Sequence, residues 1–161
     1  MNVEIICIGT LKETWLREAE GEYIKRLTPY CKVSVTELRE SRLAQDAGAA
    51  EEEAVRLSEG AALLAAAKKK GKAYVFALDM RGRKLTSEKF ADTIQKLALE
   101  GKSALVFLIG GSLGLPEAVR EGADFVLSFS EMTFPHQMMR VLLTEQLYRA
   151  QKILRGEPYH K

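Results

Sequence analysis

Short apolar runs alternate with longer stretches whose apolar residues recur at helical spacing. The short runs are rich in Val, Ile, Leu and Phe, which predicts β-strands. They lie at residues 3–9, 32–38, 73–79, 104–109 and 124–130. The runs at 73–79 and 104–109 are continuously apolar, as central parallel strands are, whereas 32–38 alternates as an edge strand does.

The stretches between these runs predict α-helices at residues 11–28, 46–70, 86–99, 116–121 and 135–155. Strands that alternate with helices form a mostly parallel sheet between layers of helices. We therefore expect an α/β fold. At 161 residues, the chain fits a single domain spanning residues 1–161.

The composition argues against several classes of protein but does not identify the function. The formal net charge is only +2, which argues against a polycation that coats nucleic acid unselectively. Cys7 and Cys31 show no metal-binding or redox spacing, so we expect two reduced, buried thiols in a cytoplasmic protein. No apolar stretch is long enough to cross a membrane, and no carboxylate–histidine cluster predicts a metal site.

Two loops that follow buried strands carry the candidate chemistry. Ligands of open α/β sheets bind outside the carboxyl ends of the strands. The first loop, Gly110–Gly114, matches neither the dinucleotide fingerprint nor the P-loop. Its glycines either let the backbone approach a ligand or another loop closely, or serve a tight turn with positive φ, and both interpretations stay open. The second loop, Ser128–Pro135, places hydroxyls, a carboxylate and aromatic rings before a helix, which is typical of an apolar pocket with polar tips.

For two other polar residues near these loops, Asp79 and His136, we expect structural roles. Asp79 ends the preceding strand, and we expect its carboxylate to cap a turn there. His136 falls in the first turn of the last helix, which predicts a capping or packing role. The only other histidine, His160, lies one residue from the end of the chain. The chain also lacks the G-x-S-x-G elbow of serine hydrolases.

Taken together, several motifs resemble those of one family, the RlmH (formerly YbeA) family of SPOUT-class methyltransferases. The motifs are Leu78-Asp-x-x-Gly82, Phe107-Leu-Ile-Gly-Gly-Ser-x-Gly114, Leu127-Ser-Phe-Ser-Glu-Met-Thr-Phe-Pro-His-Gln-Met-Met-Arg-Val141, Glu145-Gln-x-Tyr-Arg149 and Arg155-Gly-Glu-Pro-Tyr-His160. The resemblance covers the full chain. It implies methyl transfer from S-adenosylmethionine to N3 of a pseudouridine in large-subunit (23S) ribosomal RNA, on the assembled ribosome and without a metal. It also implies a SPOUT-type fold with a C-terminal deep trefoil knot, which generic fold rules would not predict.

The resemblance also assigns site residues. The family's cofactor positions fall on Leu78, Gly110, Phe129, Ser130, Glu131, Met132, Thr133 and Phe134. Adenine fits a slot between Leu78 and Phe134. The acceptor nitrogen must lose a proton, and our hypothesis gives this step to His160 or Tyr159, with Arg140 at the rim of the site stabilising the imidate anion.

The resemblance implies a homodimer in which the C-terminal tail lies near the partner's active site. Candidate phosphate contacts are Arg81, Arg83, Lys84, Arg149, Lys152 and Arg155. Alternatives stay open: a SPOUT enzyme acting on transfer RNA or on another ribosomal nucleotide, a non-enzymatic nucleotide- or ribosome-binding module, and a flavodoxin-like binding domain.

Overall fold

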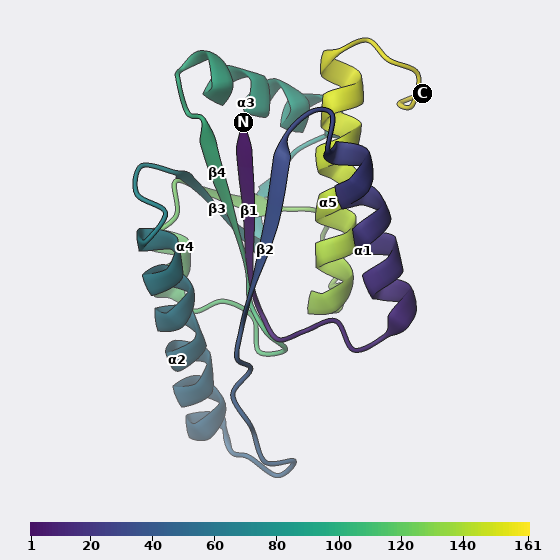
Figure 1. Cartoon of the computed structure of the whole chain (residues 1–161). Coiled ribbons are helices and arrows are strands. Elements are labelled where there is room, and N and C mark those ends of the chain that lie inside the picture. The colour runs from purple at the N-terminus through teal and green to yellow at the C-terminus, as the bar shows by residue number, and fades with distance from the viewer.

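A single five-stranded sheet, in the order β2-β1-β4-β3-β5, forms the centre of the molecule (Figure 1). The computed structural model describes all 161 residues. The strands are β1 (Asn2–Ile8), β2 (Lys32–Leu38), β3 (Tyr74–Lys84), β4 (Ala104–Ile109) and β5 (Phe125–Ser128). The helices are α1 (Thr14–Leu27), α2 (Ala49–Lys68), α3 (Ser87–Leu99), α4 (Glu117–Glu121) and α5 (His136–Leu154). Every strand pairs in parallel with its neighbours, so the predicted α/β class is confirmed.

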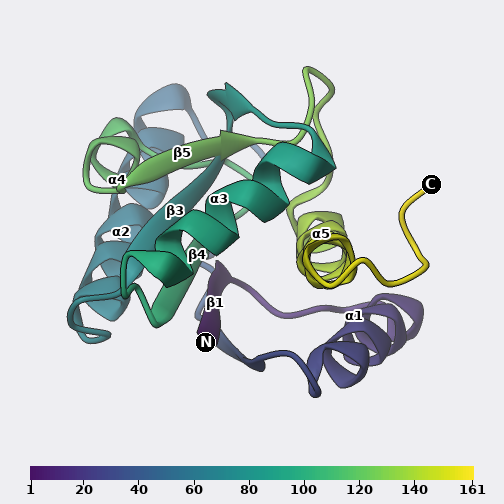
Figure 2. The ribbon, with the colours of Figure 1, turned by 90° about the horizontal axis from the view of Figure 1, so that it is seen from above.

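Alternating side chains divide the core between the two faces of the sheet. In β4, Leu105 and Phe107 pack on one face with residues of α1, α3 and α5, whereas Val106 and Leu108 pack on the other face with α2 and α4. Figure 2 shows these two groups of helices on opposite sides of the strands. Central strands buried on both faces explain the continuous apolar runs in the sequence.

Most predicted boundaries are confirmed to within a few residues, and the local reasons are visible. Thr86 caps α3, because its hydroxyl oxygen accepts a hydrogen bond from the backbone N–H of Lys89 at 3.2 Å. Pro116 and Pro135 precede α4 and α5 as cap residues, one position outside the helix each was expected to begin. Cys7 and Cys31 are buried free thiols, as expected.

Strand β3 is longer than its sequence predicts. A strand ending at Asp79 was expected, but the chain continues to Lys84. Leu78 and Arg83 both lie opposite Leu127 of β5, so the four residues 79–82 bulge out between them. Asp79 still caps a turn, since its Oδ1 accepts from the backbone N–H of Arg81 at 2.9 Å. The turn signal was therefore correct locally, but it marks a bulge and not the end of the strand.

The two ends of the sheet carry different parts of the chain. The carboxyl ends of the strands, the glycine turn after β4 and the start of α5 lie at one end (Figure 1). The 19 residues of α5 then run about 28 Å, so the C-terminal tail lies at the opposite end of the molecule, the end at which β1 begins. None of the helices combines the length and the apolar character needed to span a bilayer. The knot implied by the resemblance stays a prediction.

Candidate active site

A cleft of about 610 Å³ opens at the carboxyl ends of β3, β4 and β5. Its volume falls in the range of small-molecule sites. Three loops and the start of α5 form its walls, with one residue from α2. The lining residues are Arg56, Leu78–Arg81, Ile109–Leu115, Leu127–Ser130, Met132–His136 and Met139.

The structure brings most of the predicted cofactor residues to this one cleft. Those that line it are Leu78, Gly110, Phe129, Ser130, Met132, Thr133 and Phe134. Glu131 does not line it, because its exposed carboxylate forms an ion pair with Lys84. That pair also holds the pKa of Glu131 below its usual value. The structure therefore places Glu131 outside the cleft wall.

The glycine turn after β4 is shaped by close packing. A Cβ on Gly110 would lie 2.8 Å from the backbone carbonyl of Gly114, and a Cβ on Gly111 would lie 2.9 Å from Oε2 of Glu59. Within the turn, positive φ occurs only at Gly114, where it is +75°. The close-approach interpretation thus holds at Gly110 and Gly111, and the tight-turn interpretation holds at Gly114.

Two serines fix the loop after β5. The Ser128 hydroxyl donates to the carbonyl oxygen of Ser130 at 3.0 Å, and the Ser130 hydroxyl oxygen accepts from the backbone N–H of Met132 at 3.0 Å. This fixed loop leaves large apolar side chains uncovered: Met132 is 75% exposed and Phe134 is 37% exposed. Apolar residues held in the open beside a cleft are typical of a surface that a ligand covers.

An arginine joins the other two loops. Arg120 of α4 donates to the carbonyl oxygen of Leu115 at 2.7 Å and lies 3.4 Å from the carboxylate of Asp79. It thereby connects the bulge after Leu78 to the end of the glycine turn. Asp79 lines the cleft but is already paired, which agrees with the structural role expected for it.

Arg140 does not lie at the rim of the cleft, so that expectation is wrong. The residue is 4% exposed, and its guanidinium is bound by Glu20 of α1 and Glu37 of β2. Burial disfavours the cation, but hydrogen bonds to the two carboxylates outweigh it and raise the pKa of Arg140 above its ordinary value. Three of its N–H groups bind these carboxylates, so the buried guanidinium joins α5 to α1 and β2 and is not exposed to an imidate anion in the cleft.

Tyr159 and His160 also lie away from the cleft of their own chain. The Tyr159 hydroxyl donates to Oε1 of Glu145 at 3.0 Å, and burial together with such hydrogen bonds raises the pKa of this phenol, which keeps it a donor. Nδ1 of His160 lies 3.3 Å from Nη1 of Arg149, which can only donate. Nε2 of His160 therefore carries the proton and donates to Glu88 at 2.7 Å.

Two residues of α5 line the cleft that sequence reasoning did not place there. A capping or packing role was expected for His136, but no side chain caps α5. His136 and Met139, three positions apart on one face of the helix, both line the cleft. Burial lowers the pKa of His136, so the neutral imidazole predominates at pH 7. The start of a helix that follows a cleft loop was the signal that could have found both residues.

Comparison with known proteins decides the family. A family model described as "Predicted SPOUT methyltransferase" matches residues 1–160. The chain belongs to the SPOUT methyltransferases. Members of this family take their methyl group from S-adenosylmethionine. Across this SPOUT chain, no group of three or more His, Cys, Asp or Glu side chains is arranged to hold a metal ion.

Full-length relatives agree with this family. The SPOUT chain is 49% identical over 161 residues to Ribosomal RNA large subunit methyltransferase H of Clostridium novyi (strain NT), covering 100% of both chains. It is 48% identical to the protein of the same name from Carboxydothermus hydrogenoformans, again over 100% of both chains.

The solved structures share the fold. The tRNA (m1G37) methyltransferase of Aquifex aeolicus superposes with a TM-score of 0.55 at 13% identity, covering 92% of this chain and 70% of that one. TrmJ from Z. mobilis ZM4 gives a TM-score of 0.54 at 18% identity, covering 100% of this chain and 73% of that one.

Proposed function

We propose that this SPOUT methyltransferase transfers a methyl group from S-adenosylmethionine to N3 of a pseudouridine in large-subunit (23S) ribosomal RNA, on the assembled ribosome in the cytoplasm. One observation carries the proposal: residues that the family resemblance assigns to the donor converge on a single cleft. The full-length relatives named for large-subunit ribosomal RNA support the choice of substrate.

The cleft fits the donor in size and in chemistry. Leu78 and Phe134 supply apolar surface for the adenine ring, and the loop after β5 lines the cleft beside them, where its backbone would read the edge of the ring. The bare backbone at Gly110 lets a ligand lie close to the turn. When bound, S-adenosylmethionine supplies a methyl group on a sulfonium, which is an activated leaving group. The loops fixed by Ser128, Ser130 and Arg120 hold the site in one shape, so that donor and acceptor align and water is excluded.

The acceptor proton requires a base, and we assign it to the tail of a second copy of the chain. His160 lies beyond the far end of α5, about 28 Å along the helix from the cleft of its own chain. In a homodimer whose last helices run antiparallel, the partner's tail reaches the cleft instead. His160 then accepts the N3 proton, while Tyr159 donates a hydrogen bond that orients the acceptor.

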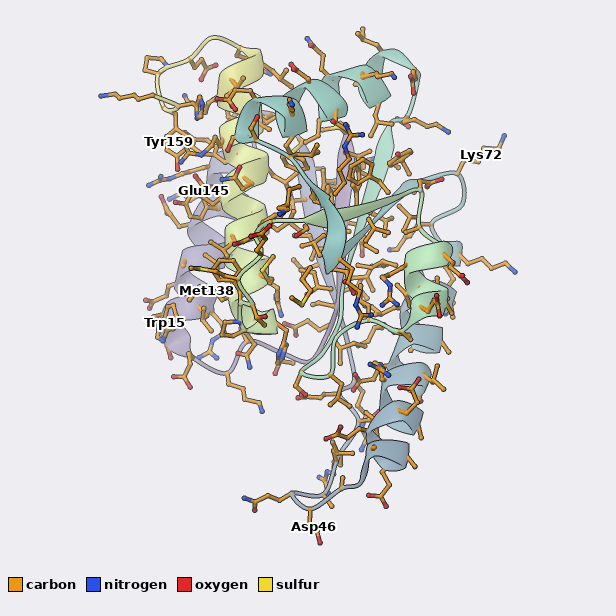
Figure 3. The ribbon with its side chains drawn as sticks, turned by 180° about the vertical axis from the view of Figure 1, so that it is seen from behind. Trp15, Asp46, Lys72, Met138, Glu145 and Tyr159 are labelled. Atoms are coloured by element: carbon orange, nitrogen blue, oxygen red, sulfur yellow. The ribbon has the colours of Figure 1, made fainter.

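An exposed tryptophan on the side formed by α1 and α5 supports the homodimer. Trp15 is 54% exposed, which is unusual for so large an apolar side chain. Figure 3 shows Trp15, Met138, Glu145 and Tyr159 along the side of the molecule formed by α1 and α5. A second copy packed on this face would cover Trp15 and bring two α5 helices together.

The structure narrows the set of basic residues available to ribosomal RNA. Ion pairs with carboxylates occupy Lys84, Arg149 and Lys152. Arg81 is exposed on the bulge at the cleft, and Arg83 is exposed where β3 resumes its pairing with β5. Arg155 is exposed beside the tail, with its guanidinium over the ring of Tyr30. We assign phosphate contacts to Arg81, Arg83 and Arg155, because none of them forms an ion pair within the chain.

The test is methylation of ribosomes that lack this modification. Purified protein and S-adenosylmethionine are incubated with such ribosomes, with deproteinised ribosomal RNA or with transfer RNA, and the nucleosides are identified by mass spectrometry. We expect one N3-methylated pseudouridine from ribosomes and little from the free RNAs. A product in transfer RNA or at another nucleotide would favour a different SPOUT specificity. Failure to bind S-adenosylmethionine in calorimetry would favour a non-enzymatic module.

A further inference from the structure

His136 is a cleft residue whose imidazole has no partner in the chain. It is half-buried at the start of α5, and neither ring nitrogen makes a hydrogen bond within the protein or is sealed from solvent. Among the charged side chains of the cleft wall, Asp79 pairs with Arg120 and Arg56 pairs with Glu53. Arg81 is exposed at the cleft and forms no ion pair, and Nε of Arg56 is buried without a hydrogen-bond partner. Since the nitrogens of His136 reach solvent, water solvates the ring in the free protein, and both nitrogens stay available to a ligand bound in the cleft.

The backbone around His136 is held firmly, so the ring is presented at a fixed place. The neighbouring Gln137 accepts a hydrogen bond from the backbone N–H of Lys12 at 3.1 Å, and the N–H of Met139 donates to the carbonyl oxygen of Pro135 at 3.1 Å. Arg140, four positions further on, is anchored between Glu20 and Glu37. The first turn of α5 is thus tied to two other elements, which is how a preorganised site is built.

We propose that His136 is a catalytic residue that donates an N–H hydrogen bond to the acceptor carbonyl oxygen next to N3. This inference rests on the proposed function. When N3 loses its proton to the base, the negative charge spreads onto the flanking carbonyl oxygens. The nitrogen then forms its bond to the methyl carbon, and the pair of the breaking carbon–sulfur bond returns to sulfur. A donor at the carbonyl oxygen stabilises the imidate before transfer, which is the role that sequence reasoning gave to Arg140.

The charge state of the ring suits this role. Burial is the largest cause that lowers the pKa of His136 and favours the neutral imidazole. Glu40 opposes it, with a larger effect than either Lys12 or Arg140, whose positive charges reinforce burial. A neutral imidazole carries one N–H donor, and because no protein group holds either nitrogen, the proton can sit on the one that faces the acceptor. A neutral histidine is an established electrophilic partner for a carbonyl whose oxygen gains charge.

The experiment compares His136→Ala and His136→Asn with the wild type on ribosomes, under single-turnover conditions at saturating S-adenosylmethionine. Donor affinity is measured by calorimetry and folding by thermal denaturation. We expect His136→Ala to lower the transfer rate by about 10²-fold or more, with donor affinity changed less than about twofold. His136→Asn keeps an amide donor and should recover part of the rate.

Two results would overturn the inference. One is a transfer rate of folded His136→Ala that stays within about threefold of the wild-type rate. If His136→Ala does not fold, the same result in both His136→Asn and His136→Phe would overturn the inference. The other is a weakened donor affinity that accounts for the whole loss, since His136 would then bind the donor. A wild-type protein that methylates no ribosome would instead reject the proposed function, so the two failures are distinguishable.

Discussion

The guanidinium of Arg140 binds both carboxylate oxygens of Glu20, with Nε 2.9 Å from Oε1 and Nη2 2.8 Å from Oε2. The two residues are 120 positions apart, and both are buried. Glu37 accepts from the remaining Nη1 at 2.7 Å. The start of α5, which lines the cleft, is therefore fixed to α1 and β2 by one side chain.

Replacing Arg140 by methionine should destabilise the protein strongly, because the carboxylate of Glu20 is left buried without a counter-charge. We expect a loss of about 3–5 kcal/mol in the free energy of unfolding, measured with urea. The control is Arg26→Met, which removes an exposed pair with Glu22 on α1 and should cost less than about 1 kcal/mol. Equal effects of the two substitutions would contradict the structural role of Arg140.

Gly111→Ala should deform the glycine turn. The new methyl group would lie 2.9 Å from the Glu59 carboxylate, so the turn or α2 must move. We expect a loss of about 1–3 kcal/mol in stability and weaker binding of S-adenosylmethionine in calorimetry. Gly21→Ala is the matched control: nothing lies within 4 Å of its added Cβ in α1, and it should stabilise by about 0.5–1 kcal/mol. Unchanged donor affinity in Gly111→Ala would mean that the turn is not part of the site.

Glu59→Gln should change the pH dependence of stability. Burial raises the pKa of Glu59, which is only 5% exposed, so the folded state favours the protonated form. The wild type is therefore relatively more stable below the ordinary pKa of the carboxyl group and loses that stability as pH rises through the raised pKa. Glutamine keeps the oxygen that accepts from the backbone N–H of Ser41 and cannot ionise. We expect the variant to gain stability relative to wild type from pH 4 to pH 8; a constant difference would contradict this cause.

Arg81→Ala and Arg83→Ala should weaken ribosome binding, and more so at low salt. Each lost phosphate contact should reduce the slope of log affinity against log salt by about 1, measured by filtration or light scattering. Lys72→Ala is the control, because Lys72 is also an exposed cation but does not line the cleft and lies on the side opposite α1 and α5 (Figure 3). A loss of equal size in all three variants would indicate a general charge effect.

The fold was largely predictable because each strand and helix carries its own periodic pattern. The apolar run of β4 predicts its bounds without error, since Ala104–Ile109 is buried on both faces. The extent of β3 was not predictable: the turn formed by Asp79 and Arg81 is local, whereas the return of the chain to pair with β5 depends on a strand more than 40 residues away.

The site was predictable only in part, for the same reason. The strand-end rule and the family motifs placed Leu78, Gly110 and the loop after β5 together, and these residues line one cleft. The sequence patterns did not show that Arg140 is buried and paired with Glu20 and Glu37, because those residues are far from Arg140 along the chain. Nor could they show that Lys84 would draw the Glu131 side chain away.

The most direct test of the composite site is complementation between two defective copies. Phe134→Arg places a cation in the donor cleft, and His160→Ala removes the tail base; each homodimer should be inactive on ribosomes. When both are co-expressed with different tags and the mixed dimer is purified, one intact site forms from the sound cleft of one chain and the sound tail of the other. We expect about half of the wild-type transfer rate. A mixed dimer as inactive as its parents would contradict a site shared between two chains.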